Sequence, residues 1–186
     1  MVWRMPSHNN AVYLSFDDGP IPQVTSWVLD TLSDYEAKAT FFCVGENVKK
    51  YPDLYHRILT AGHATGNHTH SHFNGWKHTT RQYLKNVAAC AALVKSDLFR
   101  PPYGKITRKQ YHVIRERYRV IMWDVLSGDF DKNTSKEKCL KNVLSKTRSG
   151  SIIVFHDSLK AWKNLHYTLP RALKHFKESG YTFEAL

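Results

Sequence analysis

The chain has 186 residues, of which 42% are hydrophobic and 23% are charged, and this length suits one globular domain better than two. Its nine glycines and seven prolines are too few for a fibrous or low-complexity chain. No apolar run approaches the roughly 18 residues that a membrane span requires. We therefore exclude the membrane-spanning, disordered and fibrous classes, and we expect residues 1–186 to form a single domain.

Basic residues outnumber acidic ones by 27 to 16, and the formal net charge is +11. The excess lies in residues 94–186, which hold 19 basic and 9 acidic side chains. Such a charge is typical either of a solvated basic face or of a protein that meets a polyanion, such as a nucleic acid, a membrane surface or an acidic cell-wall polymer. No arginine-rich arm or nucleic-acid-binding motif accompanies it, so we expect no nucleic acid partner.

The three cysteines, Cys43, Cys90 and Cys139, are odd in number and far apart, which predicts buried thiols rather than a disulfide framework or a zinc knuckle. Residues 1–6 contain neither an apolar stretch long enough for a secretory signal nor a small-residue cleavage site. The sequence as it stands therefore predicts a cytoplasmic protein, with association with the cell envelope as the alternative. No pattern in the sequence specifies an oligomeric state.

Short strand-like runs alternate with helical patterns along the whole chain. The expected strands are Ala11–Phe16, Ala39–Val44, His63–Asn67, Asp97–Phe99, Arg119–Val125, Ser151–His156 and Tyr181–Ala185. The expected helices, about six in number, begin near Pro22, Asn47, Thr79, Thr107, Ser135 and Leu169, and the second and third of them are expected to end at Gly62 and Val94.

About seven strands in alternation with helices predict a parallel sheet with right-handed crossovers. A complete eightfold barrel usually needs about 250 residues, which is more than this chain has. We therefore expect an α/β fold of the shortened, distorted (β/α) barrel type, with an open doubly wound sheet as the alternative.

The unusual polar residues collect at the carboxyl ends of the expected strands, where the active sites of such folds lie. They come from five segments of the chain: Asp17 with Asp18; His68 with His70 and His72; Arg100; Asp124 with Asp129; and His156 with Asp157. The fold would therefore bring carboxylates, imidazoles and a guanidinium to one rim.

Asp17 and Asp18 are adjacent carboxylates at the end of an apolar strand, and burying them together is costly unless a cation is present. Successive side chains at a strand end point in different directions, so one carboxylate can face a metal while the other faces a water molecule. The alternative is an ordinary surface turn over Asp17–Pro20.

The histidine segment is the sharper signal. In a helical turn His68 and His72 would share one side, whereas an extended chain would also align His70 with both. A carboxylate with two imidazoles and open positions is typical of a site for zinc or a similar divalent ion with an activated water. Chance clustering among the 11 histidines is the alternative.

Two further segments carry candidate catalytic groups. In Arg100–Gly104 two prolines fix the backbone, so its arginine could pair with a catalytic carboxylate while the amide of Tyr103 faces an oxyanion. A structural proline turn is the alternative. His156 ends an apolar strand and suits a general acid, with Asp129 or Asp157 to orient it, and a satisfied rim histidine is the alternative.

Together these residues resemble the five ordered motifs of the NodB-type polysaccharide deacetylases, carbohydrate esterase family 4. The matching stretches are Ser15–Pro20, His68–His72, Arg100–Tyr103, Trp123–Phe130 and Ile153–His156. The resemblance implies a distorted (β/α) barrel, one divalent metal ion and hydrolysis of N-acetyl groups on amino sugars. We expect the metal to be zinc, with cobalt, nickel or manganese as alternatives.

The resemblance also implies a role for each polar residue. The metal ligands would be Asp18, His68 and His72. The general base would be Asp17, held by Arg100, and the general acid would be His156, held by Asp129.

Three residues would contact the substrate. The amide of Tyr103 would help to bind the oxyanion, and Phe130 and Ile153 would line the acetyl-methyl pocket, where the family usually has tryptophan and leucine. The expected function is therefore a metal-dependent deacetylase acting on a glycan that contains N-acetylglucosamine, of the peptidoglycan or chitin type, with acetate as a product. The alternatives are an esterase on O-acetyl sugars, a hydrolase for a small amide, and a non-catalytic polyanion-binding module.

Overall fold

The computed structural model of the chain describes residues 1–6 and 10–186. The strands in this part of the chain are β1 (Ala11–Asp17), β2 (Ala39–Cys43), β3 (Ala64–Asn67), β4 (Leu98–Phe99), β5 (Arg119–Val120), β6 (Val125–Leu126), β7 (Ile152–His156) and β8 (Thr182–Phe183). They form one sheet in the order β5-β4-β3-β2-β1-β7-β6, and β8 pairs with β1 off this path. Every pairing between these strands is parallel.

Helices connect successive strands except β5 and β6, which residues 121–124 join without a helix. The α-helices are α1 (Pro22–Asp34), α2 (Gly45–Lys50), α3 (Pro52–Thr60), α4 (Thr80–Ala91), α5 (Arg108–Ile114), α6 (Lys136–Lys146) and α7 (Trp162–Glu178), and the 3-10 turns are η1 (Gly75–Lys77) and η2 (Pro102–Gly104). Among the described residues, no helix combines the length and the apolar character that crossing a bilayer requires.

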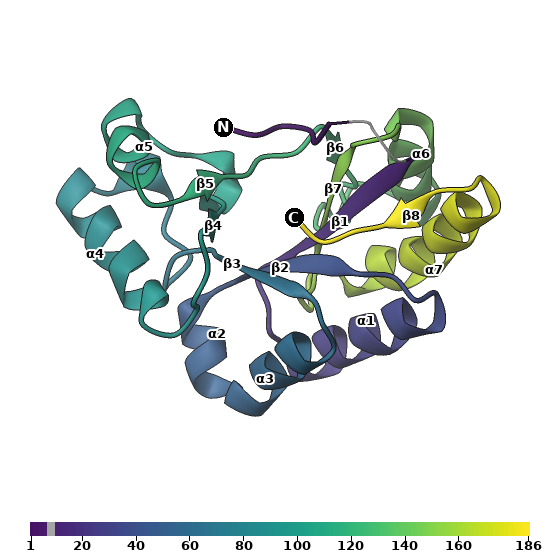
Figure 1. Cartoon of the computed structure of the whole chain (residues 1–186), viewed down its shortest axis with the longest axis horizontal. Coiled ribbons are helices and arrows are strands. Elements are labelled where there is room, and N and C mark those ends of the chain that lie inside the picture. Colours follow the sequence, from purple (N-terminus) through teal and green to yellow (C-terminus); the bar gives the residue numbers. More distant parts are fainter. Residues whose placement is uncertain (7–9) are drawn as a thin grey trace.

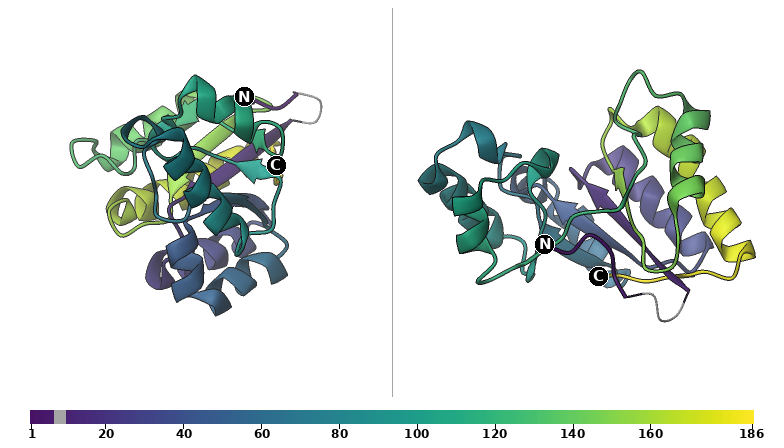
Figure 2. Two further views of the ribbon diagram at one scale, coloured as in Figure 1. Left: turned by 90° about the vertical axis from the view of Figure 1, so that its left-hand side faces the viewer. Right: turned by 90° about the horizontal axis from the view of Figure 1, so that it is seen from above.

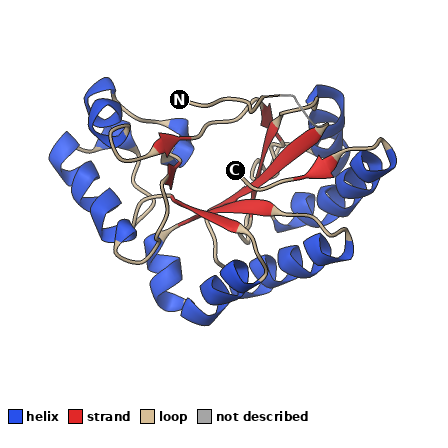
Figure 3. Ribbon diagram, in the orientation of Figure 1, coloured by secondary structure: helices blue, strands red, loops and turns tan. Residues whose placement is uncertain are grey.

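The sheet curls into a half-barrel with the helices on its outer side (Figures 1 and 3). Strand β1 lies inside the sheet between β2 and β7, and the edge strands β5 and β6 do not pair with each other. A doubly wound sheet would have helices on both faces, which is not what the ribbon shows. The prediction of a shortened, distorted barrel with about seven parallel strands is confirmed.

Residues 119–125 do not form the single strand that the sequence predicts. Strand β5 pairs with β4 at one edge of the sheet, whereas β6 pairs with β7 at the other edge. Residues 121–124 therefore cross the open side of the half-barrel. An apolar run that spans this gap cannot be distinguished from one long strand by composition alone.

The amino-terminal residues also cross the open side (Figures 1 and 2). Val2 bridges to Ile121 beyond β5, and Arg4 bridges to Ser151 just before β7. These contacts link the two edges of the sheet by main-chain hydrogen bonds, among them one from the amide of Met122 to the carbonyl oxygen of Val2 at 2.7 Å.

Three helical segments differ from their predicted bounds, and one of them, α4, ends at Ala91 rather than at Val94. The segment expected from Asn47 to Gly62 consists of α2 and α3, because Pro52 begins a second helix after a non-helical Tyr51. Asn47 lies inside α2 rather than at its N-cap. The last helix begins at Trp162, seven residues before its predicted start, and includes Pro170.

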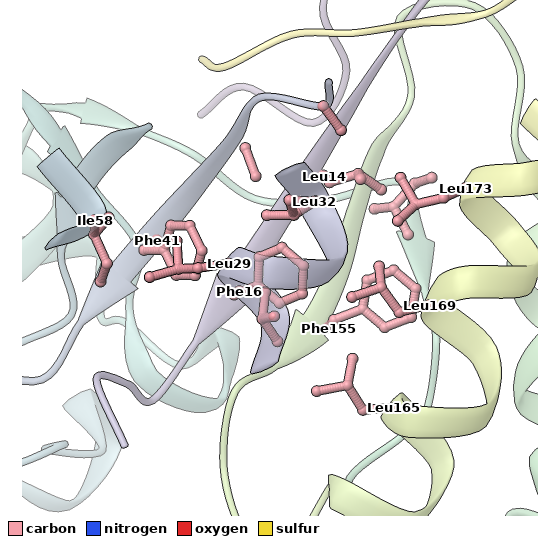
Figure 4. Packing of buried hydrophobic residues seen from close by; sticks show 14 of the residues in the cluster. Leu14, Phe16, Leu29, Leu32, Phe41, Ile58, Phe155, Leu165, Leu169 and Leu173 are labelled. Carbon is pink, nitrogen blue, oxygen red and sulfur yellow. The ribbon is translucent and has the colours of Figure 1, made fainter. Parts of the chain in front are cut away.

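Side chains from the outer face of the sheet and from α1 and α7 form the main hydrophobic core (Figure 4). Phe16 of β1 stacks between Phe41 and Phe155 of the neighbouring strands, with ring centroids 5.1 and 5.8 Å apart. A second cluster, which includes Ala11, Tyr13 and Ile152 near the amino ends of β1 and β7, fills part of the inner side. The inner side is thus packed at that end, and the carboxyl ends of the strands are left to build a site.

Candidate active site

The two carboxylates at the end of β1 have different partners. Asp17 Oδ1 accepts a hydrogen bond from Nη1 of Arg100 at 2.7 Å. Asp18 Oδ1 lies 3.1 Å from Nε2 of His72. Asp18 adopts a left-handed backbone conformation, with φ of 87°, which turns the chain as the strand ends. The structure therefore separates the two carboxylates as the sequence predicts.

The loop that carries Asp18 is fixed from several sides. Asp157 accepts hydrogen bonds from the amide of Gly19 at 2.9 Å and from the hydroxyl of Thr25 at 2.6 Å. Asn47 Nδ2 donates to the carbonyl oxygen of Asp18 at 2.7 Å. A Cβ atom at Gly19 would overlap the carboxylate of Asp157, and burial raises the pKa of Asp157 to about 8. Asp157 therefore secures this loop and does not orient His156.

Asp18, His68 and His72 each offer one ligand atom, and these atoms all lie within 4.8 Å of one another. His68 Nδ1 lies 2.8 Å from the carbonyl oxygen of Arg100, a contact that requires the proton on this nitrogen and leaves Nε2 as the ligand. His72 Nδ1 lies 3.2 Å from the hydroxyl of Tyr103, while its Nε2 faces Asp18. Both imidazoles thus present the same nitrogen to one point.

The charge states of these groups also suit a cation. Burial lowers the pKa of His68 to about 4, so its ring is neutral at pH 7. Burial alone would raise the pKa of Asp18, but the hydrogen bond with His72 and the neighbouring histidines hold that pKa well below its usual range. One carboxylate oxygen and two imidazole nitrogens form a donor set typical of zinc and similar divalent ions. These residues fit the metal that the sequence predicts.

His70 does not join this cluster. Residues 68–72 are neither helical nor extended, because Thr69 and His72 have φ values of 64° and 51°. The His70 ring lies against Gly45 of α2, and its Nδ1 is buried without a hydrogen-bond partner in the described part of the chain. A local turn, rather than helical spacing, brings His68 and His72 together.

Arg100 follows β4 and is completely buried. Besides Asp17, its Nη1 donates to Ser15 Oγ at 2.8 Å, and its Nη2 donates to the carbonyl oxygen of Met122 at 2.9 Å. The guanidinium carbon lies 4.0 Å from the ring centroid of Phe42. Each partner fixes the guanidinium, which in turn fixes Asp17 and compensates its buried charge.

The second pair joins His156, which is partly buried, to the buried Asp129. Asp129 Oδ1 lies 2.8 Å from His156 Nδ1, and its Oδ2 accepts a hydrogen bond from the backbone amide of His156, also at 2.8 Å. Burial by itself would lower the pKa of His156. The charge and hydrogen bond of Asp129, with smaller contributions from Asp18 and Asp17, outweigh burial and raise that pKa to about 9. His156 is therefore cationic at pH 7 and keeps Nε2 free.

These groups surround one cavity of about 320 Å³. Its lining residues are Asp17, Asp18, His68, His72, Tyr103, Gly104, Trp123, Leu126, Phe130, Val154, His156 and Lys160. Tyr103 has a φ of 60°, and its amide makes no hydrogen bond within the described residues, so the amide is available to an oxygen of a ligand. The ring of Phe130 packs against that of His156, with centroids 4.8 Å apart.

The structure corrects the prediction for Ile153. This side chain is fully buried in the main core between the sheet and the helices, and it does not line the cavity. Val154 lines the cavity instead. Successive residues of a strand face opposite sides, so Val154 shares a face with His156, whereas Ile153 shares one with Phe155. That alternation in the sequence could have identified Val154.

Asp124 is also absent from the rim. Its carboxylate accepts hydrogen bonds from the hydroxyl of Ser151 at 2.9 Å and from the amide of Ile152 at 2.8 Å. Both partners lie at the amino end of β7, because Asp124 precedes β6 rather than following a strand. Sequence reasoning also missed three cavity residues: Trp123 of the crossing segment, Leu126 of β6 and Lys160 of the turn after β7.

Fold and site together define a class of α/β protein. It is a parallel half-barrel whose strand ends carry a cluster of one carboxylate and two imidazoles beside an Arg–Asp pair and a His–Asp pair. The five segments that the sequence singles out supply these groups in chain order.

Comparison with known proteins agrees with this description. The profile of the polysaccharide deacetylase family matches residues 4–117. Two curated relatives are peptidoglycan-N-acetylglucosamine deacetylases of Bacillus cereus. One is 34% identical over 82% of this chain and 58% of its own length, and the other is 30% identical over 98% and 89%. A crystal structure of a peptidoglycan N-acetylglucosamine deacetylase superposes with a TM-score of 0.90 at 31% identity, covering 100% of this chain and 90% of the other.

The chain therefore belongs to the polysaccharide deacetylase family, the NodB-type group also classified as carbohydrate esterase family 4. The chain spans little more than half the length of the first of these relatives.

Proposed function

We propose that this protein is a metal-dependent deacetylase that hydrolyses N-acetyl groups of amino-sugar polymers to acetate and a free amine. The observation that carries the proposal is the convergence of three units on one cavity: the Asp18, His68 and His72 cluster, the Asp17–Arg100 pair and the His156–Asp129 pair.

Asp18, His68 and His72 would hold one divalent ion, with zinc as the first choice and cobalt, nickel or manganese as alternatives. When bound, such an ion polarises a carbonyl oxygen and lowers the pKa of a water molecule toward about 7. The proton of His68 Nδ1, held by the Arg100 carbonyl, fixes the ring orientation that this role requires.

Asp17 is the proposed general base. Its Oδ1 is engaged by Arg100, whereas its Oδ2 lies 4.0 Å from His68 Nε2 and so faces the ligand cluster. This oxygen is placed to take the proton from a water molecule that attacks the amide carbon. Because Arg100 holds the carboxylate in one orientation, the proton acceptor is already positioned before the substrate binds.

The amide of Tyr103 would donate to the oxygen of the tetrahedral intermediate. A preorganised donor of this type is worth about 3 to 4 kcal/mol in the transition state. The amine nitrogen leaves poorly unless it is protonated, and His156 Nε2 would supply that proton while Asp129 holds Nδ1. The C–N bond then breaks, and acetate and an uncharged or protonated amine are released.

The names of the relatives support an amino-sugar substrate. Two of them are described as deacetylating N-acetylglucosamine in peptidoglycan, which favours a peptidoglycan-type glycan for this chain. The apolar wall formed by Leu126, Phe130 and Val154 suits the methyl group of an acetyl substituent.

The experiment that tests the proposal is acetate release from N-acetylated chito-oligosaccharides and peptidoglycan fragments. Protein loaded with zinc or cobalt is compared with the same protein stripped by a chelator. Acetate that depends on the metal supports the proposed reaction, and the preferred fragment identifies the glycan. Loaded protein that leaves the N-acetyl groups of all these glycans intact, while it cleaves O-acetyl esters or a small amide, would refute it.

A further inference from the structure

We propose that Lys160 selects glycans that carry a carboxylate beside the acetylated sugar, so that the site prefers an acidic glycan to a neutral one. This inference rests on the proposed function, since it concerns the substrate of the same cavity.

Lys160 lies in the turn between β7 and α7, four residues after His156, and its side chain is exposed. It nevertheless lines the catalytic cavity together with His156 and Phe130. Its Nζ lies 5.6 Å from the ring centroid of Phe130, and that ring in turn packs against His156. A contact of an ammonium with an aromatic face favours this position, so the charge is held at the mouth of the cavity next to the proposed acid.

The ammonium of Lys160 has no carboxylate partner among the described residues. The carboxylates of the cavity are already engaged, Asp17 by Arg100 and Asp18 by His72. The positive charge is therefore available to a group that arrives with the substrate. Because no internal ion pair has to be broken, such a group does not compete with a carboxylate of the protein for this charge.

The rest of the cavity explains why this group should be an anion outside the acetyl subsite. Leu126, Phe130 and Val154 provide an apolar wall for the acetyl group, and a lysine adds nothing to its recognition. A chitin-type chain offers only hydroxyl and acetamido groups at its neighbouring positions. A glycan substituted with carboxylates, either on an ether side chain of the sugar or on an attached peptide, offers a charge partner. The net charge of +11 acts in the same direction by drawing acidic polymers to the surface.

The test compares chemically matched substrates. Peptide-free glycan strands of N-acetylglucosamine and N-acetylmuramic acid are used with their carboxylates free and, in parallel, converted to amides. The measured quantity is the ratio of kcat/KM for acetate release from the free-acid form to that from the amidated form, at 20 mM and at 0.5 M salt.

We expect wild-type protein to favour the free-acid form at low salt, and Lys160→Met to lower the ratio about two- to fivefold. Lys160→Glu should lower it further, Lys160→Arg should keep it, and high salt should abolish the preference because the charges are screened. The control is Lys163→Met on α7, which removes an exposed charge that does not line the cavity and should leave the ratio unchanged.

An equal ratio for wild type, Lys160→Met and Lys160→Glu, both on peptide-free strands and on strands that retain their peptides, would overturn the inference, as would a preference that survives 0.5 M salt. Glycan strands that retain their peptides show whether Lys160 recognises a carboxylate of the sugar or of the peptide. If the ratio depends on Lys160 only in these peptide-bearing substrates, the recognised carboxylate belongs to the peptide. If wild-type protein released no acetate from either substrate form, that result would instead count against the proposed function. The failure of the inference and the failure of the proposed function are therefore distinct.

Discussion

Replacing Asp129 by asparagine should shift the protonation of His156 in a measurable way. Both carboxylate oxygens of Asp129 accept a hydrogen bond from His156, one from its ring and one from its backbone amide, each at 2.8 Å. Asparagine has one acceptor oxygen, so its NH₂ group must face one of the two donors. The substitution thus removes both a charge and one of the two contacts.

The size of the effect follows from the pKa of His156. That pKa is raised from 6.5 to about 9, which corresponds to about 3 kcal/mol of preference for the charged ring, and Asp129 is the largest of the charges responsible. If the whole shift were lost, the protonated fraction at pH 8.5 would fall from about three quarters to about one hundredth. Because the proposed acid must carry its proton, activity should be lost as the pH rises through about 9 in the wild type and through a value at least one unit lower in Asp129→Asn.

The assay is the pH profile of kcat/KM for acetate release from pH 6 to 10, together with a ring-proton NMR titration of His156. The raised pKa also stabilises the fold, and this contribution is complete below pH 6.5 and lost as the pH rises through about 9. The variant should therefore be most destabilised, relative to wild type, at neutral and acidic pH. If kcat/KM fell at the same alkaline pH in wild type and in Asp129→Asn, that result would refute the assignment of His156 as the acid.

Three further substitutions test other parts of the site. His72→Ala removes a proposed ligand and should lower metal affinity at least tenfold, with activity falling in proportion to the metal content of dialysed protein; a fully loaded, active variant would contradict this. Asp17→Asn should retain the metal and abolish turnover because only the base is removed, and retained turnover would reverse the roles of the two aspartates. Gly19→Ala would push a methyl group into the carboxylate of Asp157 and should lower the free energy of unfolding by about 2 kcal/mol in urea titrations, an expectation that an unchanged midpoint would disprove.

Much of the site could be predicted because the alternation of strands and helices implies that all strands run in the same direction. In a parallel sheet all carboxyl ends meet at one rim, so Asp17, Arg100 and His156 could be assigned to one place before any distance was known. The apolar runs before these residues identify them as strand ends. The half-barrel followed from the same alternation and from the length of the chain.

The remaining features depend on information that a local pattern does not contain. The sequence assigns Ile153 to the cavity because of its position in the family motif. In a strand, however, only residues an even number of positions from His156 share its face, and Ile153 is three positions away. The pairing of His68 with His72 depends on positive φ values at Thr69 and His72, which these residue types rarely adopt and which tertiary packing imposes.

The interior position of β1, between β2 and β7, has a consequence for the synthesis of the chain. Strand β2, one of the neighbours of β1, follows it closely in translation. Its other long partner, β7, is formed by residues 152–156, and the edge of β1 that β7 covers stays unpaired until these residues have been translated. Pairings between such distant segments form slowly, and an unpaired apolar strand edge invites association with other chains. We therefore expect nascent chains of this protein to depend on chaperones until β7 has emerged, and chains truncated before residue 152 to aggregate rather than fold.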